Sequence, residues 1–349
     1  MTKFKAWSRC FGLFYAKTNM KKITLSLSLL ALSAILIQCT PAQPETQEAV
    51  AETVVEEQAE DSRILPSWND GRHRDRILDF VARVTDTSSV EYVAPDQRIA
   101  VFDNDGTLWS EQPIYFQLYF ALDRAELLGI EHPEVALEGG YGPLLDLFAL
   151  THTAMTAREF DGIVTAWLDT AKHPETNKHF TDMVYQPMLE LLDYLRANEF
   201  ETWIVSGGGI DFMRPWTQKV YGIPPQQVIG SSVQTIFENT GDGPAIRRLG
   251  KVDFVDDKEG KPVGIQRHIG RIPILAVGNS DGDLQMLQYT ASNELTNMQV
   301  YIHHTDSVRE WAYDKDSHIG EFHKGYEYAL DNDWIIVDME KDWATIYPE

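Results

Sequence analysis

The segment that decides the fold is Arg98-Ile-Ala-Val-Phe-Asp-Asn-Asp-Gly-Thr-Leu108. It opens with a short apolar run, residues 99–102, which is typical of a fully buried parallel strand. The run leads into two carboxylates, Asp103 and Asp105, and then into Gly106, which allows the chain to turn sharply. Because open α/β sheets bind their ligands at the carboxyl ends of their strands, we expect a ligand site directly after this strand.

The two aspartates predict a metal site. In an extended chain residues i and i+2 point the same way, so the side chains of Asp103 and Asp105 face one pocket. Two negative charges this close need a cation or a proton to offset them. Oxygen ligands of this kind suit Mg²⁺, which binds beside substrate phosphate. The alternative is an acidic turn in which Asp and Gly are ordinary turn formers.

The composition indicates a globular protein that does not bind nucleic acid. The chain has 349 residues, enough for one large domain or two modest ones, and 43% of them are hydrophobic. A formal net charge of −23 repels nucleic acid, so we expect no such partner. The two cysteines, Cys10 and Cys39, do not indicate a disulfide framework. Nothing in the sequence decides the oligomeric state.

The N-terminus predicts export. Lys21 and Lys22 precede an apolar stretch of signal-peptide length, residues 23–37, and Cys39 follows it. This arrangement resembles the lipobox of bacterial lipoproteins, in which the cysteine is acylated, although Gln38 stands where a small residue is usual. We therefore expect residues 1–39 to be a signal peptide, with Met20 as an alternative start. The protein would then be periplasmic or on the outer surface, and its only membrane contact would be a lipid on Cys39. A plain secretory signal is the alternative.

Residues 40–69 should form an acidic tether, because the run from Glu45 to Asp61 contains no Lys or Arg and little apolar surface. Beyond it, helical and strand patterns alternate, which predicts an α/β fold with a doubly wound parallel sheet. Apolar spacing predicts helices over 74–84, 111–129, 141–150, 156–172, 188–197, 210–221, 261–269, 283–289 and 322–330. Strands are predicted over 98–102, 200–205, 227–229, 232–237, 272–277, 299–303 and 334–337. Residues 247–261 are charged and predict a loop, with a small hairpin as the alternative.

Two further polar segments follow predicted strands. Ser206-Gly207-Gly208-Gly209 would open a helix, where backbone amides and the helix dipole favour an anion and the Ser206 hydroxyl adds a donor. A flexible turn would look the same in the sequence. The second segment is Gly278-Asn279-Ser280-Asp281-Gly282-Asp283. Its acids lack the later bidentate glutamate that a calcium loop requires.

Together these segments resemble the haloacid dehalogenase superfamily of hydrolases. Asp103–Thr107 is similar to its motif I, Asp-x-Asp-Gly-Thr, Ser206 to motif II, and residues 278–283 to motif IV, Gly-Asp-x-x-x-Asp. The Val-Ser-Gly-Gly sequence resembles the phosphoserine phosphatase branch. The resemblance spans about residues 70–305. It implies a Rossmann-like core, residues 70–109 and 188–349, with a helical cap, residues 110–187, inserted after motif I. Alternatively, those helices belong to the core.

The resemblance also implies roles for single residues. Asp103 would be the nucleophile, Asp105 the general acid and then base, and Lys261 the cation of motif III, with Lys258 and Lys251 as alternatives. Mg²⁺ would be held by Asp103, by the backbone carbonyl of Asp105, and by Asn279 or Asp283. Asn279 stands where the family has an acid, so Asp281 is an alternative source of that charge. Substrate contacts are expected from Thr107, Ser206, Gly207, Gly208 and Glu111, although Glu111 can equally be a solvated residue at a helix start.

The function expected from this resemblance is Mg²⁺-dependent hydrolysis of a phosphomonoester through an aspartyl-phosphate. The substrate would be a small phosphorylated metabolite, with phosphoserine as the nearest family example. One alternative is transfer of the phosphoryl group to an acceptor other than water. Another is an exported binding lipoprotein without turnover, which the neutral Asn279 suggests.

Overall fold

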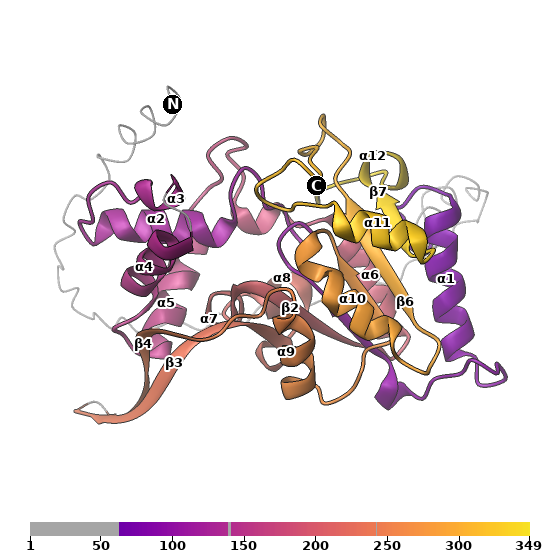
Figure 1. Cartoon of the computed structure of the whole chain (residues 1–349), viewed down its shortest axis with the longest axis horizontal. Coiled ribbons are helices and arrows are strands. Elements are labelled where there is room, and N and C mark those ends of the chain that lie inside the picture. Colours follow the sequence, from indigo (N-terminus) through magenta and orange to yellow (C-terminus); the bar gives the residue numbers. More distant parts are fainter. Residues whose placement is uncertain (1–62, 139–140, 242) are drawn as a thin grey trace, which may run out of the picture. The chain divides into compact units, whose positions relative to one another are not determined.

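The computed structural model describes residues 63–138, 141–241 and 243–349 (Figure 1). The predicted signal peptide, the lipidation site Cys39 and residues 40–62 of the predicted tether lie outside the described residues, so these assignments stay predictions. The tether prediction is wrong for residues 63–69, because Leu65 and Trp68 are buried in the core, where the Trp68 ring packs against Trp343. Within the described part of the chain, no helix has the length and apolar character needed to cross a membrane.

A mostly parallel sheet forms the centre of the described chain. Its strand order is β4-β3-β2-β1-β5-β6-β7, with β1 in the middle. Every neighbouring pair is parallel except β3 and β4, which run antiparallel at one edge. The strands are β1 (Ile99–Phe102), β2 (Glu201–Gly209), β3 (Val228–Thr240), β4 (Gly243–Phe254), β5 (Leu275–Gly278), β6 (Met298–His303) and β7 (Ile335–Asp338).

Helices cover both faces of this sheet. In β1, Ala100 and Phe102 join one apolar core while Ile99 and Val101 join a second core on the opposite face, as the two-residue period of a strand requires. The first core contains α1 (Arg72–Thr85), α6 (Gln186–Ala197) and α8 (Thr217–Tyr221). The second contains α9 (Gly260–His268), α10 (Leu284–Ala291) and α11 (Lys324–Asp331), and a short helix α12 (Met339–Asp342) follows β7. The predicted doubly wound α/β fold is confirmed.

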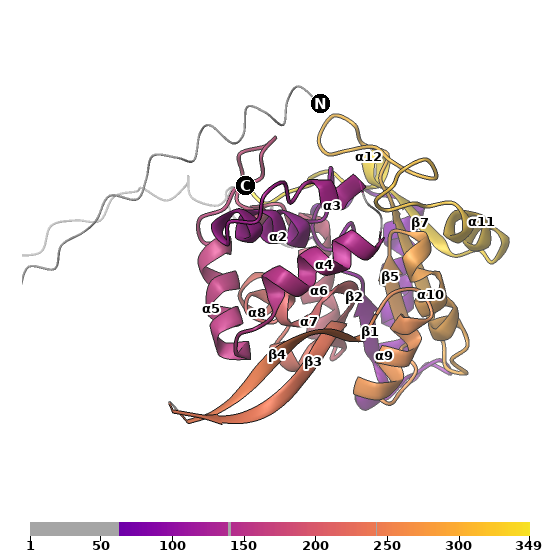
Figure 2. The same cartoon turned by 60° about the vertical axis from the view of Figure 1, so that its left-hand side comes forward.

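The segment between β1 and β2 contains helices and no named strand among the described residues. These helices are α2 (Phe116–Leu127), α3 (Val135–Glu138), α4 (Tyr141–His152), α5 (Ala157–Leu168) and then α6. Thr156 and Glu159 form a capping box that begins α5. Figure 2 shows α2 to α5 grouped beside the edge of the sheet that carries β3 and β4. Their separation as a cap, residues 110–187, stays a prediction.

The predicted loop over 247–261 is wrong for most of its length, because residues 243–254 form β4. The two short strands predicted over 227–229 and 232–237 are one strand, β3. Beyond the parallel sheet, β3 and β4 continue as a two-stranded ribbon (Figure 2). Much of the ribbon is exposed on both faces, so its sequence lacks the apolar alternation of a half-buried strand. The sequence signal that was overlooked is Gly241-Asp242, a dipeptide favoured in two-residue hairpin loops.

Other boundaries differ for local reasons. The predicted helix 210–221 is two helices, α7 (Ile210–Met213) and α8, because Pro215 between them has no N–H to continue the first. The predicted helix 111–129 begins only at Phe116, after Pro113. The predicted strand 200–205 continues as β2 through the glycines to Gly209.

The topology places a crevice at the carboxyl end of β1. The strand that follows β1 in the chain, β2, lies on one side of it, and β5 lies on the other. Ligands of open α/β sheets bind where the strand order reverses in this way. Asp103, Ser206 and Asn279 therefore converge on the same edge of the sheet.

Candidate active site

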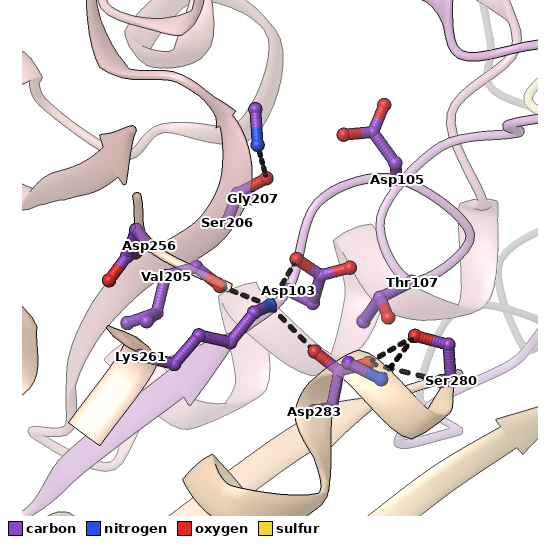
Figure 3. A network of polar contacts seen from close by, with 12 residues as sticks. Asp103, Asp105, Thr107, Val205, Ser206, Gly207, Asp256, Lys261, Ser280 and Asp283 are labelled. Atoms are coloured by element: carbon purple, nitrogen blue, oxygen red, sulfur yellow. Dashed lines mark hydrogen bonds and ion pairs between the residues drawn. The ribbon is translucent and has the colours of Figure 1, made fainter. Parts of the chain in front are cut away.

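The centre of the site is the ammonium group of Lys261. Its Nζ atom donates hydrogen bonds to Asp103 Oδ1 (2.6 Å), Asp283 Oδ1 (2.6 Å) and the carbonyl oxygen of Val205 (2.8 Å), as Figure 3 shows. The Lys261 side chain is only 2% exposed. Although burial by itself lowers the pKa of this amine, the adjacent Asp103 and Asp283 carboxylates raise the pKa above the ordinary value for lysine. The amine is therefore charged at neutral pH.

The alternatives for the motif III lysine do not reach Asp103. Lys251 and Lys258 are both exposed, whereas Lys261 is buried in the first turn of α9. A tight turn fixes the start of that helix, because a Cβ atom at Gly260 would lie 2.1 Å from the carbonyl oxygen of Val255. Only glycine fits there.

The carboxylates of motif I have different surroundings. Burial raises the pKa of Asp103 well above its usual value, and the Lys261 ammonium opposes this shift. One oxygen of Asp103 binds Lys261, and the other has no hydrogen-bond partner among the described residues. Asp105 lies away from Lys261 in Figure 3, and its Oδ1 accepts a hydrogen bond from Trp109 Nε1 (2.9 Å). Burial raises the pKa of Asp105 as well, while the bond from Trp109 lowers it.

The turn of motif I is held by contacts that sequence reasoning missed. Gly106 has a φ of +75°, and a Cβ atom at this position would lie 2.0 Å from Asn279 Nδ2, so only glycine fits. The carbonyl oxygen of Gly106 accepts a hydrogen bond from His304 Nε2 (2.7 Å). The His304 ring in turn stacks on Tyr313 and contacts Glu310. These three residues come from the chain after β6, about 200 positions away in the sequence, where no local pattern links them to motif I.

The glycine-rich segment differs from the expected helix N-terminus. Residues 206–209 are the last residues of β2, and the helix that follows, α7, has only four residues. The Gly208 amide donates to Ser206 Oγ (3.1 Å), and the Gly209 amide donates to Gln117 Oε1 (2.7 Å). The close packing of this segment requires Gly230, whose Cβ would lie 2.7 Å from the carbonyl oxygen of Gly208. Ser206, Gly207 and Gly208 still line the cavity beside Asp103.

Asn279 is part of a buried network with Glu111. Its Nδ2 donates to Glu111 Oε1 (2.7 Å), which also accepts a hydrogen bond from Tyr313 OH (2.8 Å). Its Oδ1 accepts a hydrogen bond from Thr107 Oγ1 (3.2 Å). Glu111 is only 2% exposed, so the alternative of a solvated residue at a helix start is wrong, and Glu111 lines the cavity beside Asp103. Glu111 and Thr107 together orient the Asn279 side chain, because Glu111 binds its amide nitrogen and Thr107 binds its amide oxygen.

The other acids of motif IV have structural partners. Asp283 Oδ1 binds Lys261, and Oδ2 accepts the backbone amides of Asn279 (2.9 Å) and Ser280 (3.1 Å). The Asp281 carboxylate accepts three backbone amides at the start of α11, those of His323, Lys324 and Gly325. Asp281 therefore holds α11 and does not replace the charge missing at Asn279.

The donor set fits Mg²⁺, although no group of three His, Cys, Asp or Glu side chains among the described residues gathers as a metal cluster. Mg²⁺ needs only one or two carboxylates, because water and substrate phosphate complete its coordination. Asp103 has one oxygen without a hydrogen bond, and Asn279 presents an amide oxygen beside Thr107. Asp283 Oδ1 binds the Lys261 ammonium and its Oδ2 accepts two backbone amides, whereas Asn279 Oδ1 accepts only one hydroxyl, so of the two predicted alternatives Asn279 fits better.

A cavity of about 360 Å³ contains the site. One end is lined by Asp103, Asp105, Ser206 and Lys261. The other end is lined by residues that sequence reasoning did not single out: Leu118, Leu144, Leu145, Phe148, His152, Asp211, Phe212, Val233, Arg248 and Val252. Burial and the nearby arginines lower the pKa of His152 to about 3, so this imidazole is neutral.

Asp256 is a buried carboxyl next to the site. Neither of its oxygens has a hydrogen-bond partner among the described residues, and the side chain is fully buried. Burial raises the pKa of Asp256 to about 7, although the Lys261 ammonium acts in the opposite direction. This carboxyl changes charge near neutral pH.

Comparison with known proteins gives a family. The family model described as haloacid dehalogenase-like hydrolase matches residues 100–288. No curated protein matches the chain. Solved structures with a similar arrangement include a functionally unknown protein from Anaerococcus prevotii (17% identity, TM-score 0.43), covering 66% of this chain and 85% of that one. A second similar structure is a protein of unknown function from Bordetella pertussis (16% identity, TM-score 0.45). The match covers 70% of this chain and 99% of the Bordetella chain. A third is a phosphoserine phosphohydrolase-like protein from Francisella tularensis (17% identity, TM-score 0.36). The match covers 59% of this chain and 87% of the Francisella chain. These structures are too distant to indicate a function.

We expect the Asp256→Asn variant to remove a pH dependence of stability. The folded protein keeps Asp256 protonated up to about pH 7, whereas the unfolded chain ionises it above about pH 4. Wild-type stability therefore falls as pH rises between these values, by about 1.4 kcal/mol per unit of pKa shift at most. The unfolding free energy of Asp256→Asn relative to wild type should rise over this range, as measured by urea denaturation. The exposed Asp253→Asn variant is the control, and a parallel profile for both variants would contradict the assignment.

The Asp281→Ala variant tests the role of Asp281 in holding α11. Loss of a carboxylate that accepts three backbone amides should cost about 1–2 kcal/mol of unfolding free energy. Asp316→Ala, at an exposed loop position, should change it by no more than a few tenths of a kcal/mol. A large loss of Mg²⁺ affinity in a stable Asp281→Ala protein would instead make Asp281 a metal ligand.

Proposed function

Since the chain belongs to the haloacid dehalogenase-like hydrolase family, we propose that it hydrolyses a small phosphomonoester through an aspartyl-phosphate formed on Asp103. The observation that carries this proposal is the placement of Asp103. Its carboxylate lies at the end of the central strand, is held by Lys261, and has one oxygen free at the wall of the cavity. A fixed, partly desolvated carboxylate of this kind is suited to nucleophilic attack.

In the first step, a carboxylate oxygen of Asp103 attacks the phosphorus atom, and the bond from phosphorus to the alcohol oxygen breaks. The departing alkoxide needs a proton. Asp105 can supply it from Oδ2, because Oδ1 already accepts a hydrogen bond from Trp109. Burial favours the protonated form of Asp105 that this role requires.

In the second step, a water molecule attacks the phosphorus atom of the aspartyl-phosphate. Asp105, now ionised, accepts the proton of that water, and the bond from phosphorus to Asp103 breaks. Inorganic phosphate and the original carboxylate of Asp103 result. Asp105 serves first as an acid and then as a base, so the two steps regenerate its proton.

Positive charge must offset the phosphoryl oxygens in both steps. Lys261 supplies one charge, and the hydroxyl of Ser206 adds a hydrogen-bond donor on the same wall. Mg²⁺ held by Asp103, the Asp105 backbone carbonyl and Asn279 would add further positive charge at the phosphate. The export of the protein and its anchoring at Cys39 remain predictions from the N-terminal sequence.

The Asp103→Asn variant tests the nucleophile. An amide of the same shape cannot attack phosphorus, so turnover should fall by at least about a thousandfold while the protein stays folded. Phosphate release from a panel of small phosphomonoesters, with Mg²⁺ and with a chelator, measures this. Equal release by wild type and variant would exclude Asp103 as nucleophile. Absence of release by folded, Mg²⁺-loaded wild type would favour a binding protein, and product analysis with added alcohols would detect transfer to other acceptors.

A charge exchange tests the pairing of Asn279 with Glu111. Asn279→Asp alone should destabilise the protein by about 2 kcal/mol or more, because it removes a donor and places two buried carboxylates together. Adding Glu111→Gln should recover most of that loss, since the amide and the carboxylate then exchange positions. The unfolding free energy and the Mg²⁺ concentration for half-maximal turnover are the measurements. A double variant no more stable than Asn279→Asp would contradict the pairing.

A further inference from the structure

The cavity has two ends of different chemistry. The charged end surrounds Asp103 and Lys261. The rest, which we call the apolar half, is lined by hydrophobic side chains from three helices and from the two strands of the hairpin. They are Leu118 of α2, Leu144, Leu145 and Phe148 of α4, Phe212 of α7, Val233 of β3 and Val252 of β4. A volume of about 360 Å³ exceeds what a phosphate group needs and lies within the range of small-molecule sites.

The hairpin completes the apolar half. Val233 and Val252 are directly opposite each other in the antiparallel pairing of β3 and β4. Opposite residues of an antiparallel pair project from the same face, so both valines face the cavity. Leu144, Leu145 and Phe148 lie within five residues of one another on α4, which packs against β4. The leaving group of a phosphoester bound at Asp103 would therefore lie between a helix and a hairpin.

The polar residues of this half are engaged with one another. Arg248 is 4% exposed, forms an ion pair with Asp211, and donates from Nε to the carbonyl oxygen of His152 (2.8 Å). His152 is neutral, and its Nε2 atom lies within hydrogen-bond distance of Gln117 Nε2 (3.1 Å). At the other end, Lys261 is committed to Asp103 and Asp283. Both basic side chains that line the cavity, Arg248 and Lys261, are therefore already paired with acids. Neither is free to bind a carboxylate of the substrate.

The charges of the cavity walls also disfavour a substrate with a carboxylate. The residues lining the cavity include six acids, Asp103, Asp105, Glu111, Asp211, Asp257 and Asp283, and two bases, Arg248 and Lys261. A leaving group with its own negative charge, such as the carboxylate of phosphoserine, finds no base in these walls that is free of an acid, so its desolvation would not be offset. A leaving group with neither charge nor many polar atoms meets no such penalty, and it gains from burial against the apolar walls.

We propose that the substrates are phosphomonoesters of apolar, uncharged alcohols, whose hydrocarbon part occupies the apolar half between α4 and the β3–β4 hairpin. This inference rests on the proposed phosphatase activity and narrows it to a substrate class. The amino-acid phosphate expected from the family resemblance becomes a poor substrate.

The test compares kcat/KM of the purified full chain, with Mg²⁺, on ethyl, butyl and hexyl phosphate, on phosphoserine and on phosphoethanolamine. The alkyl phosphates have similar primary alkoxide leaving groups, so differences among them report binding of the hydrocarbon. We expect kcat/KM to rise about three- to fourfold with each methylene that the apolar half buries. Phosphoserine and phosphoethanolamine should both react more slowly than butyl phosphate, because the charged group of each would lose its water against the apolar walls.

A matched pair of variants locates the effect. Val252→Lys places a cation in the wall, and Ile246→Lys makes the same change on the same strand at similar exposure, 40% and 45% respectively, outside the cavity. Val252→Lys should reduce the gain per methylene at least twofold and raise the activity on phosphoserine relative to butyl phosphate. Ile246→Lys should leave the gain in kcat/KM per methylene and the ratio of phosphoserine to butyl phosphate activity as in wild type.

The outcomes separate this inference from the proposed function. A flat alkyl series, a preference for phosphoserine or phosphoethanolamine, or equal effects of the two variants would overturn the substrate class while leaving the phosphatase proposal intact. Hydrolysis of no ester by folded, Mg²⁺-loaded protein, or hydrolysis that persists in Asp103→Asn, would overturn the proposed function and the substrate class with it.

Discussion

The site depends on one buried ammonium group. Lys261 Nζ contacts a carboxylate that follows β1, a carbonyl of β2 and a carboxylate that follows β5, and so it joins the ends of three adjacent parallel strands. Burying an amine is costly unless acids offset its charge, and Asp103 and Asp283 do so here. The same two contacts leave Asp103 with one oxygen for chemistry. Stability of the sheet edge and orientation of the nucleophile therefore come from the same interaction.

A second level of organisation surrounds this centre. Glu111, Asn279 and Thr107 form one buried hydrogen-bonded chain. His304 bonds the carbonyl oxygen of Gly106 and stacks on Tyr313, which donates to Glu111. The family usually has an acid where this chain has Asn279. The Glu111 carboxylate, which also lines the cavity, accepts a hydrogen bond from the side-chain amide of Asn279. The position that the family fills with an acid is therefore neutral here, and burial raises the pKa of the neighbouring Glu111 well above its usual value.

The sequence was most informative where chemistry is local. Strand β1, the turn at Gly106 and the order of the motifs could be predicted because a few adjacent residues determine each of them. Lys261 could be selected from its position in the motif order, but only the structure separates it from Lys251 and Lys258, by its burial and its contact with Asp103. The partnership of Glu111 with Asn279 spans 168 positions and has no sequence pattern. The hairpin was missed for another reason, since a two-stranded ribbon exposed on both faces has no apolar period to detect.

The hairpin also constrains how a substrate can enter. Its second strand, β4, exchanges backbone hydrogen bonds with the connection between α4 and α5: the amide of Arg248 donates to the carbonyl of Met155 (2.9 Å), and the amide of Ala154 donates to the carbonyl of Arg248 (3.1 Å). Because β3 continues directly into the parallel sheet beside β2, the helices over the cavity are tied to the sheet by backbone contacts as well as by their own connecting segments. Helices α4 and α5 cannot swing away alone. Any opening wide enough to admit a ligand must bend the ribbon with them or pass between side chains.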